Sequence, residues 1–200
     1  MPAQSTLRAD LLAHAHEVLA ERGYGALSVR GLARALGVTP GAIYHHFDGK
    51  AGIYQAVVAD GLAAIRDRVR VAFEAEAGPA ARVRAMAEAY CAFGLDYPNT
   101  YYVVMMLRED DQPDVTEAQR APGREVLAMA ALALGELVAT GGAPPPDDPE
   151  MLALEAWAVL HGALGLIVSE RLTTAYPDFD VTRLTDAAVD RVLRMIESGG

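Results

Sequence analysis

The chain has one cysteine, Cys91, and one lysine, Lys50, among its 200 residues. A single cysteine excludes an intrachain disulfide and is compatible with a reducing cytoplasm, where we expect the protein to act. Because Cys91 has apolar neighbours, it is more typical of an inert core residue than of a redox sensor. Every other cationic side chain is an arginine.

Other patterns are missing as well. No segment shows sustained alternation of apolar and polar residues, so no β-strand is predicted. No uninterrupted apolar run reaches the roughly 18 residues of a membrane span, and the N-terminus does not resemble a signal peptide. No phosphate-binding loop, nucleophile elbow or metal motif occurs, and the pairs His14/His16 and His45/His46 diverge around their helices. The sequence therefore disfavours an enzyme, and no cofactor or metal is expected.

A basic surplus, which DNA-binding proteins often carry, is also absent. The formal net charge is −10 at pH 7. The first 50 residues carry +1 and the rest of the chain carries −11. Charge close to the DNA decides phosphate binding, and charges beyond about 8–10 Å are screened. The acidic remainder therefore does not exclude a DNA-binding role for the first 50 residues.

What the sequence does contain is a helix-turn-helix pattern over residues 28–47. Ser28 is a good N-cap for one short helix, and Gly37 ends it because glycine adopts the left-handed conformation at least cost. Thr39 then caps a second helix that has Pro40 in its first turn. The inward-facing positions are Val29, Leu32, Ala33, Leu36, Ile43 and Phe47. A short exposed helix of this kind suits the major groove, so DNA binding is the leading hypothesis.

The segment Gly37-Val-Thr-Pro-Gly-Ala-Ile-Tyr-His-His-Phe47, followed by Lys50, resembles the N-terminal domain of the TetR family of transcriptional regulators. The resemblance extends back through a first helix, Leu7 to Arg22, and covers about the first quarter of the chain. The segment Trp157-Ala-Val-Leu-His-Gly162 is similar to the signature of one class of TetR-family C-terminal domain, named for its Trp, His and Gly. The resemblance implies an all-helical homodimer in which the N-terminal domain reads DNA and the other domain binds a small molecule.

We therefore expect an all-α fold of about nine helices. A three-helix DNA-binding domain is expected over residues 1–50, and a helical ligand-binding and dimerisation domain over residues 51–200. The later helices are predicted at 50–75, 80–96, 98–108, 124–140, 150–174 and 181–197. Segments 109–123 and 141–149 are expected to be loops, the first of them partly helical.

The residues expected at the DNA are Arg30, Thr39, Pro40, Gly41, Ala42, Tyr44, His45 and Lys50. Thr39 can cap its helix and also touch phosphate, and the small residues that follow leave room for close approach. The resemblance implies that Tyr44 reaches phosphate or base and that Lys50 contacts a phosphate; for Lys50 the alternative is a solvated lysine. His45 is either an exposed reader or an idle surface histidine. Because the recognition helix has no Arg, Asn or Gln, Arg30 is the nearby candidate for guanine readout.

A second set of residues is expected to bind a ligand: Tyr90, Phe93, Tyr97, Tyr101, Met105, Trp157 and His161. Aromatic residues recur at spacings of three and four, and flexible methionines follow, which suits an adaptable apolar pocket. The same stripe fits an ordinary core equally well. His161 lies one turn after Trp157 and either hydrogen-bonds a ligand or satisfies a buried partner.

The helix predicted over 150–174 is apolar nearly all round, so it must be covered on several sides. One side can face its own domain and another a second copy, since Ala156, Gly162 and Gly165 permit close approach. We expect a homodimer through this helix and the helix over 181–197, with a thick monomeric core as the alternative.

Together these patterns predict a ligand-responsive, DNA-binding transcriptional regulator. The favoured form is a homodimeric repressor that a small apolar or aromatic inducer releases from a palindromic, double-stranded operator. The alternative is a transcriptional activator, or a helical small-molecule-binding or interaction protein without operator control.

Overall fold

The computed structural model describes residues 4–108, 113–141 and 147–197, and within these ranges every regular element is helical. The predicted all-α class is confirmed. The contacts divide the chain into two compact units, one of residues 1–62 and 99–120 and the other of residues 63–98 and 121–200. The expected boundary after residue 50 differs from this division. The reason is that the first part of α4 (Gly49–Ala75) packs into the core of the first unit.

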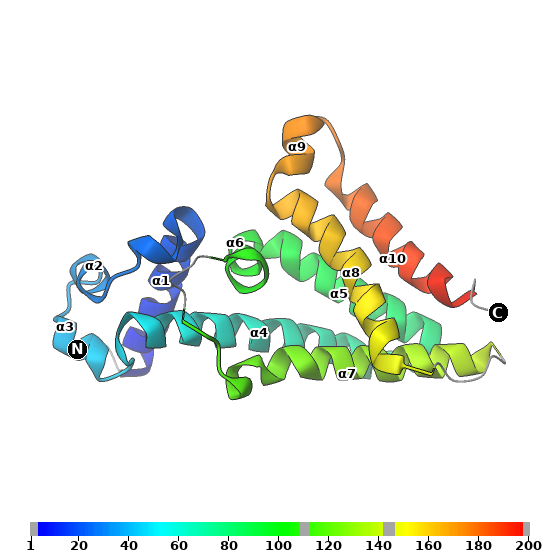
Figure 1. Ribbon diagram of the computed structural model, residues 1–200, viewed down its shortest axis with the longest axis horizontal. Helices are drawn as coiled ribbons and strands as arrows, with labels where there is room; N and C mark the ends of the chain where they lie inside the picture. Colours follow the sequence, from blue (N-terminus) through cyan, green and yellow to red (C-terminus); the bar gives the residue numbers. More distant parts are fainter. Residues whose placement is uncertain (1–3, 109–112, 142–146, 198–200) are drawn as a thin grey trace. The chain divides into compact units, whose positions relative to one another are not determined.

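The first unit is built from two stretches of sequence. It holds α1 (Gln4–Ala26), α2 (Val29–Ala35), α3 (Pro40–Tyr44), the start of α4, most of α6 (Pro98–Tyr101) and the π-helix η1 (Tyr102–Met106) (Figure 1). One buried core joins α1, α2, α3 and α4, and Val103 and Leu107 from the second stretch belong to it. Gly23, with φ 73°, breaks the helical path near the end of α1, as the sequence predicts.

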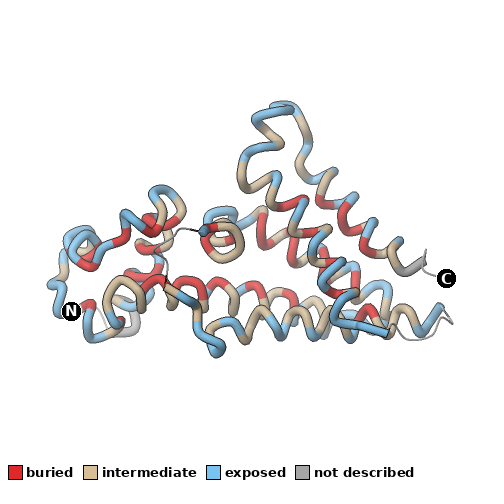
Figure 2. The backbone as a smooth tube through the Cα atoms, viewed as in Figure 1, coloured by how far each residue is buried: buried red, intermediate tan, exposed pale blue. Residues whose placement is uncertain are grey.

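In the second unit α5 (Pro79–Asp96), α8 (Pro149–Val168) and α10 (Val181–Glu197) pack side by side (Figure 1). Figure 2 shows buried segments along all three helices. A Cβ added at Gly94 would lie 2.8 Å from both terminal carbons of Leu164, so α5 and α8 approach as closely as a glycine allows. This unit also holds α7 (Glu117–Thr140) from residue 121 onward and α9 (Arg171–Ala175).

Three predicted helices differ from the structure. The helix expected over 150–174 ends at Val168, because Ser169 donates its hydroxyl to the Gly165 carbonyl (2.5 Å) and Glu170 adopts a left-handed conformation (φ 58°). The helix expected over 98–108 is α6 followed by the π-helix η1. The helix expected at 124 begins earlier, at Glu117. Residues 109–112 and 142–146 of the two expected loops lie outside the described part of the chain.

Among the described helices, α8 alone is long and apolar enough to cross a membrane by length and composition. Glu155 and His161 interrupt its apolar sequence, which is why no continuous run is visible. Only 28% of its most apolar window is buried. The other residues of this window are exposed or only partly buried in the single chain.

Candidate nucleic-acid interface and ligand cavity

The caps that the sequence predicts for the helix-turn-helix are present. The Ser28 hydroxyl accepts the backbone N–H of Gly31 (3.1 Å), and the Thr39 hydroxyl accepts that of Ala42 (3.3 Å). Gly37 has φ 65°, a left-handed conformation that an L residue adopts only with strain. These bonds fix the start of α2 and α3 and set the turn between them.

Burial separates the two faces of α3. Ile43 is fully buried and belongs to the core of the first unit, whereas the neighbouring Tyr44 is 61% exposed. Ala42 is half-buried. The other predicted DNA-facing side chains of α2 and α3, which are those of Arg30, Thr39, Pro40 and His45, are exposed along with the Gly41 backbone. The structure thus leaves one polar face of this motif open to solvent.

Lys50 is half-buried and does not project freely from the start of α4. Its ammonium nitrogen lies 3.9 Å from the centre of the Tyr24 ring and 3.5 Å from the Gly25 carbonyl oxygen, to which it donates a long hydrogen bond. The sequence shows an aromatic residue, Tyr24, just after the predicted end of the first helix, but it does not show that this ring contacts Lys50. Lys50 therefore stabilises the junction of α1 and α4 in addition to any role at phosphate.

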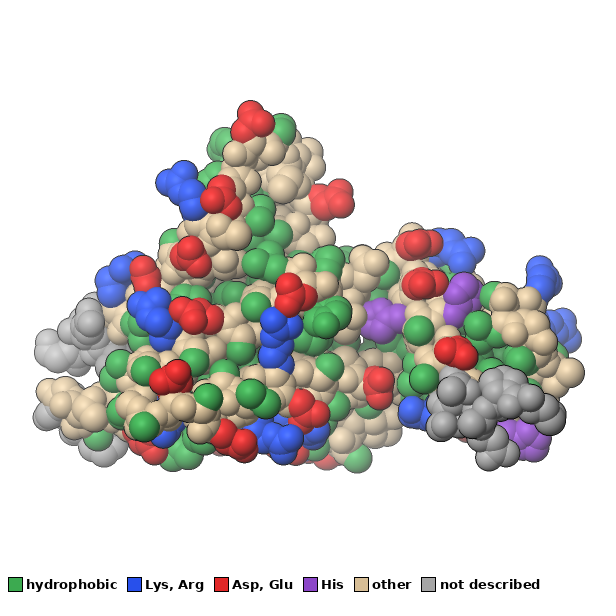
Figure 3. Space-filling model, turned by 180° about the vertical axis from the view of Figure 1, so that it is seen from behind, with side chains coloured by type: hydrophobic (Ala, Val, Ile, Leu, Met, Phe, Trp, Pro, Cys, Tyr) green, Lys and Arg blue, Asp and Glu red, His purple; other side chains and the backbone are tan. Residues whose placement is uncertain are grey.

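On the face shown in Figure 3, acidic and basic side chains alternate over the second unit and do not gather into a single patch. Such interspersed charges are screened over about 8–10 Å, so they do not prevent the first unit from approaching a phosphate backbone.

An apolar cavity of about 60 Å³ lies in the second unit. None of the described residues in its walls is charged; they come from α4, α5, α7, α8 and α10 and consist of Val69, Val83, Met86, Ala87, Tyr90, Val126, Leu127, Ala130, Ala133, Leu134, Ala153, Ala156, Trp157, Leu160 and Val192. An apolar wall of this kind favours a hydrocarbon-like or aromatic ligand, because none of these side chains could neutralise a charge.

Two of the predicted ligand residues meet at this cavity. The indole N–H of Trp157 donates a hydrogen bond to the Tyr90 hydroxyl oxygen at 2.8 Å, so the polar groups of the two rings contact each other. His161 stacks on Trp157 with ring centres 5.2 Å apart, and partial burial lowers the pKa of its imidazole. At neutral pH the stacked imidazole is therefore neutral.

The other predicted ligand residues do not line this cavity. Tyr101 and Met105 belong to the first unit, because η1 and most of α6 pack there. Phe93 is buried against Tyr97 with ring centres 5.4 Å apart, and Tyr97 itself is 54% exposed. The aromatic stripe is therefore divided between the two units, and the ligand-binding role of these residues remains a prediction.

The cavity residues on α7 were not among the predicted ligand residues. Val126, Leu127, Ala130, Ala133 and Leu134 follow the spacing of one helix face, a signal that the sequence contained.

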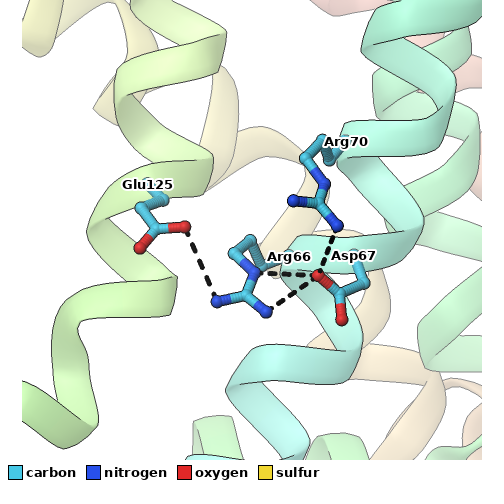
Figure 4. A network of polar contacts seen from close by, with 4 residues as sticks. All are labelled: Arg66, Asp67, Arg70 and Glu125. Carbon is cyan, nitrogen blue, oxygen red and sulfur yellow. Dashed lines mark hydrogen bonds and ion pairs between the residues drawn. The ribbon is translucent and has the colours of Figure 1, made fainter.

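Two ion pairs hold α7 against its neighbours. Arg66 on α4 lies 3.6 Å from Glu125 and is itself held by Asp67, which also binds Arg70 (Figure 4). Farther along α7, Glu136 pairs with Arg82 of α5.

Cys91 is buried at 3% exposure on α5. Burial, with smaller contributions from Asp186 and Glu88, raises the pKa of its thiol from 9.0 to about 12. The thiolate that redox chemistry requires is therefore scarce. No group of three or more potential metal ligands occurs among the residues described.

A capped helix-turn-helix with an exposed polar face, carried by an all-helical chain that has a separate apolar cavity, defines a DNA-binding transcriptional regulator. Residues 11–57 match the family described as bacterial regulatory proteins, tetR family, and residues 83–192 match the tetracyclin repressor-like C-terminal domain. The second match alone covers more than half of the chain, so the chain belongs to the TetR family. Its relatives are regulators and not enzymes.

Individual relatives agree with this assignment. The transcriptional repressor KstR2 of Rhodococcus jostii is 40% identical over 55 residues, which is 28% of this chain and 27% of that protein. The chain therefore spans about a quarter of this curated relative. A protein of unknown function from Rhodococcus sp. RHA1 is 27% identical over 94% of both chains, with a TM-score of 0.76. FadR of Bacillus subtilis, solved in complex with stearoyl-CoA, shares the fold at 16% identity with a TM-score of 0.73, over 92% of this chain and 97% of that one.

Proposed function

We propose that the chain is a homodimeric repressor that binds a palindromic operator through α2 and α3 and leaves it when a small apolar molecule enters the second unit. The exposed polar face of α3, directly beside the buried Ile43, carries the DNA-binding half of this proposal. The cytoplasm, where operator DNA is present and Cys91 stays reduced, is the proposed site of action.

On the DNA side, α3 enters the major groove with Tyr44 and His45 at its exposed end. Arg30, exposed at the start of α2, supplies the guanidinium for a guanine edge. Thr39, Pro40, Gly41 and Ala42 form the closely approaching start of α3, and Lys50 turns from the Tyr24 ring to a phosphate. In this proposal residues 1–50 carry the DNA contacts, and residues 51–200 carry the ligand and dimer contacts.

On the ligand side, the apolar cavity takes a neutral body or chain. Tyr90 and Trp157 offer the polar groups of the wall, and the indole N–H of Trp157 is already donated to the Tyr90 hydroxyl oxygen. The cavity is small, so a ligand must displace α7 outward or be small itself. The stearoyl-CoA in FadR of Bacillus subtilis shows that this fold accommodates a long acyl compound, and an acyl chain suits the present lining.

The dimer is proposed to form on the uncovered face of α8. Met151, Leu154 and Leu166 are 50%, 38% and 46% exposed, and the small residues Ala158 and Gly162 are exposed with them. α10 turns its apolar face inward, with Val189 and Val192 each 2% exposed, so it would contribute a polar flank. A second copy fits this face better than lipid does, because Glu155 is exposed beside the leucines.

Sedimentation of Leu166→Glu tests the dimer. Placing a carboxylate in the interface costs several kcal/mol, so the variant should sediment as a monomer and bind operator far more weakly. Leu132→Glu, at a 55% exposed leucine on α7, is the matched control and should stay dimeric. A dimeric Leu166→Glu would place the interface elsewhere.

Genome-wide mapping of bound sites, followed by binding assays on the recovered DNA, tests the function as a whole. A repressor should occupy a palindrome that overlaps a promoter, and apolar compounds that change Trp157 fluorescence should release it. The coupling must be reciprocal, so operator must weaken the same compound by the same factor. A chain that binds no DNA, or that binds ligand equally with and without DNA, would contradict the proposal.

A further inference from the structure

A second cavity, of about 560 Å³, lies within the first unit and is separate from the apolar cavity of the second unit. Its apolar wall includes Val58 and Leu62 of α4 and Val104 and Met105 of η1. Residues 113–120 supply the opposite side, so the site lies entirely in the unit that carries the helix-turn-helix.

Two guanidinium groups border this apolar wall, those of Arg108 and Arg120. Arg120 is 3.9 Å from Glu117, and both side chains are more than half exposed, so this pair is weak. Arg108 forms no ion pair with another described residue. The described lining thus carries two arginines and one carboxylate, that of Asp114.

The framework of this cavity is fixed at two points. Gln55 on α4 donates its amide to the Asp114 backbone carbonyl at 2.7 Å and so ties the 113–115 segment to the helix. A Cβ added at Gly61 would lie 2.5 Å from a Val104 methyl carbon, so α4 and η1 touch with no spare space. The π-helical winding of η1 is itself rare and is frequently found at functional sites.

The cavity is connected to Lys50 by two aromatic rings. Tyr54 lines the cavity and is only 5% exposed. Its ring packs edge-on against Tyr24, with ring centres 5.2 Å apart at 71°. The Lys50 ammonium also lies against the Tyr24 ring, 3.9 Å from its centre. Tyr24 therefore contacts both the cavity residue Tyr54 and the single lysine.

We propose that this cavity binds a small amphipathic carboxylate, whose anionic group pairs with Arg108 and Arg120 while its apolar body lies against α4 and η1. Binding moves Tyr54 and, through Tyr24, the Lys50 ammonium. The consequence for DNA rests on the proposed function, but the binding itself does not. The site would give the chain a second input, located inside the reading unit and distinct from the apolar cavity.

Calorimetric titration of the full chain with decanoate tests the binding. The double variant Arg108→Gln/Arg120→Gln should bind decanoate at least about tenfold more weakly, because each guanidinium–carboxylate bond is charge-assisted. Arg70→Gln/Arg183→Gln, with two arginines removed from the second unit, is the charge-matched control and should bind as the wild type does. Equal affinity in both double variants, equal affinity for decanol, or no binding of decanoate at all would overturn the proposal.

The single lysine permits a direct test of the relay. Protein labelled with ¹³C-lysine gives one ε-methylene signal, which the ring current of Tyr24 displaces. Decanoate should move this signal in the wild type and not in Arg108→Gln/Arg120→Gln. An immobile signal in the presence of bound decanoate would refute the relay.

The two proposals can fail separately. If the chain binds no DNA, the proposed function fails, while calorimetry and the lysine signal still decide the carboxylate site. If the chain binds operator but decanoate leaves both the lysine signal and the operator affinity unchanged, the second input fails alone. Trp157 in the other unit should not respond to decanoate; a fluorescence change abolished by filling the apolar cavity with Ala133→Met would assign decanoate there and overturn the proposal.

Discussion

Ile43 and Tyr44 are adjacent in α3 but should respond to alanine in opposite ways. Ile43 is fully buried, so Ile43→Ala should destabilise the protein by about 2–5 kcal/mol, the usual cost of a cavity at a buried isoleucine. Tyr44 is 61% exposed, so about two-fifths of its surface is in contact. For a side chain of roughly 200 Å² this contact is worth at most about 2 kcal/mol, and alanine retains part of it. We expect a loss near 1 kcal/mol.

For operator affinity the order of the two effects should be reversed, because Tyr44→Ala should weaken binding more than its effect on stability suggests. A tyrosine hydroxyl bonded to a phosphate is worth about 1.5–3 kcal/mol, and a dimer loses two such bonds. Tyr44→Ala should therefore weaken operator binding by roughly 10²–10⁴-fold while remaining folded. Tyr44→Phe, which keeps the ring, should retain full stability and lose only the contribution of the hydroxyl to operator affinity.

Denaturant unfolding and fluorescence anisotropy on the mapped operator give both quantities for each variant. If Tyr44→Ala unfolds as readily as Ile43→Ala, its side chain is structural and the facing of α3 is wrong. If Tyr44→Ala binds operator as tightly as the wild type, the exposed face of α3 is not the DNA-reading face.

Three further predictions concern single side chains. Lys50→Ala should lower the slope of log affinity against log salt by about 1 per protomer and cost about 0.5–1 kcal/mol of stability through the lost Tyr24 contact; an unchanged slope would remove Lys50 from the phosphate contacts. Burial lowers the pKa of His16, and the Asp60 carboxylate opposes this shift only in part, so the folded protein favours the neutral imidazole. The free energy of unfolding should therefore be at its full value above pH 6.5 and decrease below it. Thermal melts from pH 7.5 to 5.5 should show that His16→Gln flattens this decrease. Cys91, with a pKa of about 12, has a thiolate fraction roughly a thousandfold below that of an ordinary cysteine. A thiol-reactive disulfide reagent should therefore label unfolded protein at once and native protein only slowly. Rapid labelling of the native state would contradict the assignment of Cys91 as an inert core residue.

The sequence predicted local structure best where a single residue decides the backbone. Gly23 and Gly37 stop helices because their positive φ values are cheap only for glycine, and Ser28 and Thr39 start helices through their hydroxyls. The inward position of Ile43 follows from helical spacing alone. Such features are encoded within a few residues, so they can be found without tertiary information.

Features that depend on distant contacts were not predictable in this way. Tyr97 and Tyr101 continue the aromatic spacing of α5, yet the chain turns between them and they belong to different compact units. The break at Glu170 has no glycine or proline to announce it. The Lys50–Tyr24 contact joins residues from two helices, and only their packing brings the ring beneath the ammonium.

The first compact unit is discontinuous in sequence, and this limits how it can be exchanged or inherited. A fragment cut after residue 50 would lack Ile53 and Val57 of α4 and also Val103 and Leu107, all of which are buried in the same core as α1. Transplanting the operator specificity of another regulator would therefore require residues 99–120 to travel with 1–62, or the graft would expose unmatched apolar surface. A single crossover within the gene cannot move both stretches without also moving residues 63–98, which lie between them and belong to the second unit. Changes of operator preference in such a chain should therefore accumulate by point substitution on the exposed faces of α2 and α3. The core residues of the two separated stretches must meanwhile stay compatible with each other.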